Sequence, residues 1–204
     1  FFDGLPILRA QMEVSNRSDG PHCIESIAPI VISCINRGGE RERWGDDCII
    51  HIPHNGTCAE ARWVSLPLSD HGLGWAVAGS SSKRLFISNT GTWSSKEYMP
   101  MAMLEDRSSG KIWFWQIESN ASWSWEISDS GHSPYLVPGL LDESSHNWSR
   151  TLKPGEKVLS LPVAVGMMDG GFEDAAGVLT EYRRRIRRPH DDNRKLPVIF
   201  NDYM

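Results

Sequence analysis

Residues Lys111–Glu118 read Lys-Ile-Trp-Phe-Trp-Gln-Ile-Glu, and the alternation of this stretch decides the fold class. Successive side chains of a strand point to opposite faces, so Trp113 and Trp115 share one face while Phe114 lies on the other. Large apolar side chains therefore occur on both faces. This pattern predicts a strand that is buried on both sides.

A second aromatic strand is predicted over Ser122–Ile127, after a loop at Glu118–Ala121 that we expect to close a hairpin. Trp123 and Trp125 repeat the alternation, so we expect them to form cross-strand aromatic pairs with the first strand. One Trp can bury about 150–250 Å². The nine Trp of the sequence therefore suit a large sandwich better than a small domain.

Short β-rich runs separated by turn residues occupy most of the chain. The 18 Gly and 12 Pro among 204 residues leave little room for long helices. Polar clusters at Ser15–Gly20 and Asp106–Gly110 are typical of hairpin loops. Evenly spaced strands without helices between them predict a mainly β, antiparallel fold of the sandwich type. The other predicted strands are residues 7–14, 22–35 (interrupted at Pro29), 48–52, 62–68, 74–78, 85–88, 101–105 and 158–165.

The pattern changes in the last third of the chain. Gly166–Gly171 predicts a flexible break, and Phe172–Tyr182 has apolar residues at helical spacing. Acidic residues begin this segment and the arginine run 183–188 ends it, which suits the helix dipole. Pro189–Lys195 is predicted to be a polar linker to a short strand at Leu196–Phe200. We therefore divide the chain into a β-sandwich over 1–168, a linker helix and loop over 169–195, and a further element over 196–204.

Charge and hydropathy exclude two classes of partner. The chain has 21 basic and 26 acidic residues, and a net charge of −5 argues against nucleic acid. We expect the arginine run to contact a neighbouring domain. The longest near-apolar stretch, Val158–Met168, is shorter than the roughly 18 residues of a membrane span, so we expect a soluble protein without a membrane partner. Neither end resembles a natural terminus, so we expect an excerpt of a longer protein, and a cytoplasmic or secreted location stays open.

Two Cys and two His have the spacing of possible zinc ligands: Cys48, His51, His54 and Cys58. On an extended strand Cys48 and His51 point to opposite faces, so we expect no metal site and no cofactor. Disulfides Cys48–Cys58 and Cys23–Cys34 remain alternatives to four buried thiols, which we favour.

Other chemical candidates are weak. The adjacent pairs Asp46-Asp47 and Asp191-Asp192 splay apart on extended chain and are predicted to be solvated, unlike facing glycosidase carboxylates. Gly166–Gly171 matches no phosphate-binding loop. Four Asn-x-Ser/Thr sequences are glycan candidates if the protein is secreted from a eukaryote, and otherwise follow from the high Ser content: Asn16, Asn55, Asn120 and Asn147.

The order of several motifs resembles the α-galactosidases of glycoside hydrolase family 36, over nearly the whole chain. The matching segments include an Asn-to-Trp stretch with an internal Glu, a Ser-x-Lys-Glu-aromatic stretch and the paired aromatic strands. In chain order they are His54–Trp63, Gly91–Pro100, Trp113–Glu118, Ser122–Ile127, Leu152–Glu156, Pro162–Gly166, Asp169–Phe172, Tyr182 with the arginine run, and Pro197–Tyr203.

The resemblance implies a large N-terminal supersandwich, a linker helix and the truncated first strand of a (β/α)8 barrel. It also implies retaining hydrolysis of terminal α-galactosides by two Asp on later barrel strands, so we expect no catalytic residue here and no activity of this chain alone. Asp202 and Tyr203 are the expected substrate-binding residues, because barrel sites lie at the carboxyl ends of strands. Tyr203 stands where relatives usually have Trp.

The resemblance further implies a homo-oligomer that meets the α-galactoside through the full-length enzyme. Two other functions compete with this interpretation. One is a free-standing carbohydrate-binding β-sandwich module with an exposed Trp platform, and the other is a purely structural assembly domain without a barrel downstream.

Overall fold

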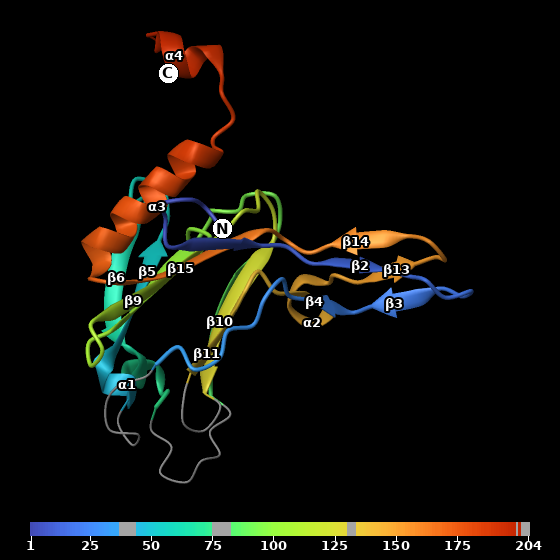
Figure 1. The fold of residues 1–204 in the computed structure, drawn as a ribbon, viewed down its shortest axis with the longest axis horizontal. Helices are drawn as coiled ribbons and strands as arrows, with labels where there is room; N and C mark the ends of the chain where they lie inside the picture. Colours follow the sequence, from blue (N-terminus) through green and yellow to red (C-terminus); the bar gives the residue numbers. More distant parts are fainter. Residues whose placement is uncertain (37–43, 75–82, 130–133, 199, 201–204) are drawn as a thin grey trace.

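The computed structural model describes residues 1–36, 44–74, 83–129, 134–198 and 200. Its main body is a sandwich of two antiparallel sheets (Figure 1). The larger sheet has the order β1 (Ile7–Ala10), β15 (Val163–Asp169), β9 (Lys111–Ile117), β8 (Met101–Asp106), β5 (Cys48–His54) and β6 (Arg62–Pro67). The smaller sheet consists of β11 (Pro134–Pro138), β10 (Trp123–Asp129) and β7 (Arg84–Asn89). The mainly β prediction is confirmed.

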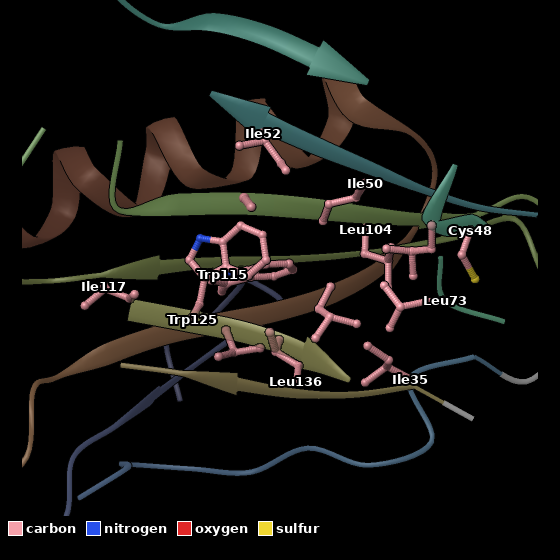
Figure 2. Close-up of a cluster of buried hydrophobic side chains, with 14 of the residues drawn as sticks. Ile35, Cys48, Ile50, Ile52, Leu73, Leu104, Trp115, Ile117, Trp125 and Leu136 are labelled. Carbon is pink, nitrogen blue, oxygen red and sulfur yellow. The ribbon is translucent and has the colours of Figure 1, made fainter. Parts of the chain in front are cut away.

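The core between the sheets is built around tryptophan, as Figure 2 shows. Trp115 of β9 and Trp125 of β10 are fully buried and meet edge to face, with ring centroids 5.2 Å apart. This contact joins the two sheets, so the predicted cross-strand pairing is wrong. The reason is that β8 and β15 already occupy both edges of β9. Residues 118–121 therefore connect the two sheets and do not close a hairpin.

The outer face of the larger sheet carries a second apolar cluster. Phe114 of β9 is fully buried there, against Leu179 and Tyr182 of helix α3 (Phe172–Ile186). The strand around Trp113 and Trp115 is therefore buried on both sides, as its alternation predicts. The hairpin loop Asp106–Gly110 between β8 and β9 is also confirmed.

Helix α3 is the expected helix, and it continues four residues past Tyr182. Its first turn is capped by Asp174, whose Oδ2 accepts a hydrogen bond from Gly171 N at 3.0 Å. The predicted linker instead contains helix α4 (Asp191–Lys195), which has acidic residues in its first turn and basic residues in its last. Described residues 196–198 and 200 lie in no strand, and Val198 is 99% exposed. Within the described chain no strand pairs with them.

Two predictions made from local signals are wrong. The expected strand over residues 158–165 is divided into β14 (Lys157–Leu159) and β15, and β15 continues through Gly166 to Asp169. The expected break at Gly166 is absent because its backbone pairs with Phe114 on one side and Ile7 on the other. The segment 74–78 falls largely outside the described residues.

A long arm extends away from the sandwich (Figure 1). It pairs β2 (Glu13–Ser15) with β14, and β3 (His22–Ile24) with β13 (Arg150–Leu152). Residues 15–20 thus join two strands with different partners, and they do not close a hairpin. The connection over residues 15–20 is held to residues 155–156 by two backbone hydrogen bonds: Asn16 N donates to Glu156 O at 2.9 Å, and Gly155 N donates to Asn16 O at 2.8 Å.

Two smaller elements complete the fold. Strand β4 (Ser26–Ile27) pairs with β12 (Leu141–Asp142), next to helix α2 (Glu143–His146). Helix α1 (Trp44–Asp47) and the 3-10 helix η1 (Leu68–His71) flank β5 and β6. None of the described helices has the length and apolar character to cross a membrane.

Candidate functional site

The substrate-binding residues expected from the sequence, Asp202 and Tyr203, lie outside the described residues. In the described part of the chain no group of His, Cys, Asp or Glu is arranged to hold a metal ion. Cys48 and His51 face opposite sides of β5, as expected: Cys48 lies in the core and the His51 ring lies 5.2 Å from Phe172 of α3.

The cysteines are free thiols, and only one of them is buried. Burial raises the pKa of the Cys48 thiol, and the charges of Asp106 and Asp47 add to this effect. Cys23, Cys34 and Cys58 are exposed, which corrects the expectation of four buried thiols. The other three lie outside the packed sheets, where the fold does not cover them.

His51 is the buried histidine on the outer face of the larger sheet. Its Nδ1 lies 2.7 Å from Ser65 Oγ, and its Nε2 lies 3.4 Å from Glu105 Oε2. Burial lowers the pKa of His51, although the Glu105 carboxylate acts in the opposite direction. The ring therefore favours its neutral form beneath Phe172.

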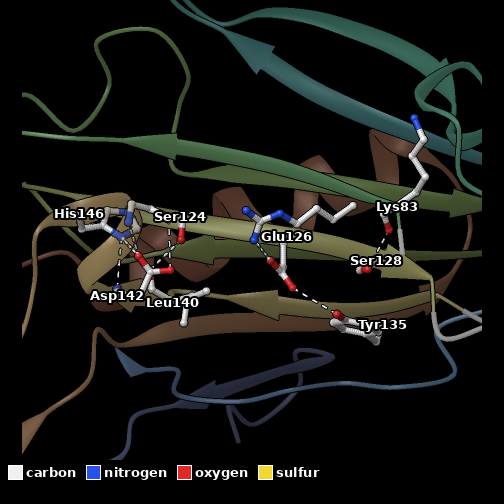
Figure 3. Close-up of polar contacts among 10 residues, drawn as sticks. Lys83, Ser124, Glu126, Ser128, Tyr135, Leu140, Asp142 and His146 are labelled. Carbon is white, nitrogen blue, oxygen red and sulfur yellow. Dashed lines mark hydrogen bonds and ion pairs between the residues drawn. The ribbon is translucent and has the colours of Figure 1, made fainter. Parts of the chain in front are cut away.

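Polar side chains on the outer face of the smaller sheet bond within the chain (Figure 3). Glu126 is 8% exposed, and accepts hydrogen bonds from Tyr135 Oη and Arg84 Nη1, both at 3.3 Å. Ser124 Oγ donates to Leu140 O at 2.7 Å. Similar bonds join Ser128 to Lys83 and Asp142 to Ser145. These contacts tie loops to the sheet, which is a structural role.

A half-buried carboxylate, that of Glu118, joins the end of β9 to helix α3. Glu118 Oε2 accepts hydrogen bonds from Arg9 Nε at 2.9 Å and Arg9 Nη2 at 2.8 Å. Glu118 Oε1 accepts a hydrogen bond from the hydroxyl of Tyr182. Burial raises the pKa of Tyr182, and the bond to Glu118 raises it further. Both carboxylate oxygens of Glu118 therefore have partners.

The next residue of α3, Arg183, lies beside a depression in the surface. Its Nε donates to Gln116 Oε1 at 2.5 Å, and its Nη2 lies 3.2 Å from Met101 Sδ. An open depression of about 580 Å³ lies here, which we call the Arg183 depression; it is lined by Pro100, Gln116, Ile117, Glu118, Ser119, Asn120 and Arg183. It is the candidate site within the described residues.

The sequence did not reveal this arrangement, because its parts are far apart in the chain. Arg9 and Glu118 are separated by 109 positions, and Arg183 and Gln116 by 67. The arginine run was the only signal, and we expected it to contact a neighbouring domain. Within the described residues Arg185 bonds to Glu181 at 2.9 Å and to Asp3 O at 2.7 Å, and the expected contact with a neighbouring domain stays a prediction.

The candidate glycan sites and the Asp46-Asp47 pair differ in how exposed they are. Asn16 is buried, and its Nδ2 donates to two carbonyl groups, so a glycan has no room there. Asn55 Nδ2 donates to Ser95 O, whereas Asn120 and Asn147 are exposed. The pair Asp46-Asp47 lies half-buried in helix α1, which corrects the expectation of a solvated pair in a polar loop.

The comparisons with known proteins identify the fold. No protein-family model matches the sequence, and no curated protein matches it. Among solved structures, the Lactobacillus brevis α-galactosidase matches 88% of this chain and 22% of its own, with 10% identity and a TM-score of 0.69. A variant of the Geobacillus stearothermophilus family 36 α-galactosidase AgaA, in complex with stachyose, matches 90% of this chain and 23% of its own, with 13% identity and a TM-score of 0.70.

A third structure, the galactosidase domain of the α-galactosidase-sucrose kinase AgaSK, matches 81% of this chain and 20% of its own, with 15% identity and a TM-score of 0.62. The chain thus spans about a fifth of the length of these enzymes. The described structure therefore has the fold of the N-terminal domain of family 36 α-galactosidases.

Proposed function

We propose that this chain is the non-catalytic N-terminal β-sandwich portion of an α-galactosidase-like enzyme that hydrolyses terminal α-galactosides with retention. The observation that carries the proposal is the match of 81 to 90% of the chain to about a fifth of several α-galactosidases. The stachyose complex of AgaA is one of these structures, and a further matching structure of an AgaA variant holds raffinose; both sugars are α-galactosides. The motif order in the sequence points to the same family.

In this proposal helix α3 connects the sandwich to a catalytic barrel that begins within residues 196–204. The helix is well anchored for this role, because Ala175, Leu179 and Tyr182 are buried against the larger sheet. Asp202 and Tyr203 would then contact the sugar at the end of the first barrel strand. The two catalytic Asp would lie farther along the barrel.

We also propose that the arm contributes to a homo-oligomer. It exposes apolar side chains that nothing in the described chain covers: Leu159 is 56% exposed and Met12 is 42% exposed. Sedimentation equilibrium of the longer protein tests this. Leu159→Asp should then shift the assembly towards monomers. An unchanged mass of the assembly would show that the arm is not part of the subunit interface.

Hydrolysis of 4-nitrophenyl α-D-galactoside tests the main proposal. This chain should be inactive, and a longer protein that contains the following barrel should release nitrophenol. If the longer protein hydrolyses other glycosides and no α-galactoside, the substrate assignment is wrong. Proton NMR of the first product should show the α anomer if the anomeric configuration is retained.

One observation favours the alternative, a free-standing carbohydrate-binding module. Trp93 is 60% exposed, whereas Trp44, Trp115, Trp123 and Trp125 are buried. An exposed indole can stack on the apolar face of a sugar. A saturable change in Trp fluorescence with raffinose, lost in Trp93→Ala and retained in Trp148→Ala, would support a module. An unchanged spectrum would favour the non-catalytic sandwich.

A further inference from the structure

Two consecutive side chains of helix α3, Tyr182 and Arg183, lie in different surroundings near the end of β9. Tyr182 points inward and is fully buried, with its hydroxyl on Glu118. Arg183 reaches over Gln116 and remains exposed as a residue, although its bond to the buried Gln116 is partly buried. Gln116 therefore fixes the guanidinium at the rim of the depression.

The charges around the depression are unequal. The Glu118 carboxylate is matched by Arg9, which donates two hydrogen bonds to the same oxygen. Among the described residues no acidic side chain pairs with Arg183, whose guanidinium instead donates to a neutral amide and a thioether. Burial lowers the pKa of Arg183, so its charge is penalised without a compensating anion.

We propose that the Arg183 depression binds a carboxylate group. With Nε held by Gln116, the remaining N–H groups of the guanidinium form the planar fork that binds carboxylates through two parallel hydrogen bonds. The side chain of Asn120 is exposed beside it and has no hydrogen bond within the described residues, so its amide can donate to the same ligand. Pro100 and Ile117 also line the depression and offer contact to carbon atoms of the ligand.

A titration of this chain with sodium acetate tests the proposal. Sodium chloride keeps the ionic strength constant, because screening alone changes surface charge interactions. The readout is the Nε–Hε signal of Arg183 in nitrogen-edited NMR spectra. We expect a saturable shift of this signal and of the Asn120 side-chain amide. A linear response shared with other arginines would overturn the proposal.

Three variants separate a bidentate site from general attraction between charges. Arg183→Gln should weaken acetate binding roughly tenfold to hundredfold, the range for hydrogen bonds to charged groups. Arg183→Lys keeps the charge and loses the fork, so it should also bind more weakly. Arg184→Gln removes the same charge from the exposed neighbour and should bind normally. Equal binding by Arg183→Gln and the native chain, read on the Asn120 amide, would refute the proposal.

The carboxylate could belong to a free ligand or to a side chain of a following domain. The same acetate titration of the longer protein distinguishes these two sources. If the shift is retained in the longer protein, the ligand is a free carboxylate. If the shift is present in this chain and absent in the longer protein, a side chain of the following domain fills the depression. The first titration does not depend on the proposed function. A longer protein that is inactive on galactosides would overturn that function and leave the acetate result unchanged.

Discussion

The substitution Gly166→Ala probes the contact between the larger sheet and helix α3. Gly166 lies in the middle of β15, opposite Phe114. A Cβ at this position would lie 2.2 Å from Phe114 Cζ, 2.3 Å from Phe114 Cε2 and 2.5 Å from Pro6 O. Carbon atoms normally approach to about 3.5–4.0 Å, so the ring would have to move by roughly 1 Å. Phe114 is fully buried in the apolar cluster beneath α3, so a shift of its ring would disturb the side chains packed around it.

Overpacking of a core typically costs about 1–3 kcal/mol. Because one of the close contacts is to a backbone oxygen, which cannot rotate away, we expect a loss at the upper end, about 3 kcal/mol. For a protein of this size each kcal/mol lowers Tm by about 2–4 °C, which gives a decrease of roughly 6–12 °C. Urea unfolding followed by Trp fluorescence measures the change in free energy directly, provided that the m-value is unchanged.

Gly177→Ala is the matched control for this substitution. Gly177 lies inside α3, and a Cβ there would meet no atom within 4 Å. Replacing a helical glycine by alanine should increase the free energy of unfolding by about 0.5–1 kcal/mol. If Gly166→Ala changes the free energy of unfolding by less than about 0.5 kcal/mol, the close packing of Gly166 against Phe114 is refuted.

Four other substitutions, at three positions, test different parts of the fold by urea unfolding. Trp115→Ala should cost about 3–5 kcal/mol. Trp115→Phe should cost less, because the indole N–H of Trp115 has no hydrogen-bond partner among the described residues. Burial tends to raise the pKa of Asp106, but hydrogen bonds from Ser108 and Ser109 outweigh this effect and lower the pKa. The ionised carboxylate therefore stabilises the folded protein, and this contribution is lost as pH falls below about 4. Asp106→Asn should weaken that loss. Burial lowers the pKa of His51. The native protein should therefore lose stability as pH falls below about 6.5, and His51→Phe should lose less. Equal pH profiles of stability in the native protein and these variants would contradict the roles given to Asp106 and His51.

The alternation of Trp113, Phe114 and Trp115 was enough to predict a strand buried on both sides. It could not predict which strands lie beside it, because periodicity describes faces and not edges. The edges of β9 are taken by β8 and β15, and the second aromatic strand had to join another sheet. The predicted Trp pairing was therefore right about the side chains and wrong about the geometry.

Local signals failed where distant backbone supplies the hydrogen bonds. A glycine in a turn-rich stretch predicts a break, but Gly166 is required in β15 because Phe114 fills the space of a side chain. The arm shows the same effect, since the backbone of β14 pairs with that of β2, with Lys157 opposite Ser15. The Lys157 side chain also donates to Glu13 across 144 positions. The candidate site depends on equally distant contacts, so spacing along the chain could not indicate it.

The two faces of β9 explain how helix α3 is fixed to the sandwich. One face places Trp115 in the sandwich core, and the other presents Phe114 and Gln116 to α3. Helix α3 is therefore fixed to the same strand that anchors the core, through apolar contacts and through Tyr182 on Glu118. Movement of α3 would expose Phe114 and separate the Glu118 carboxylate from the hydroxyl of Tyr182, and both changes are unfavourable. The orientation of α3 is thus set by the same strand that builds the interior of the sandwich.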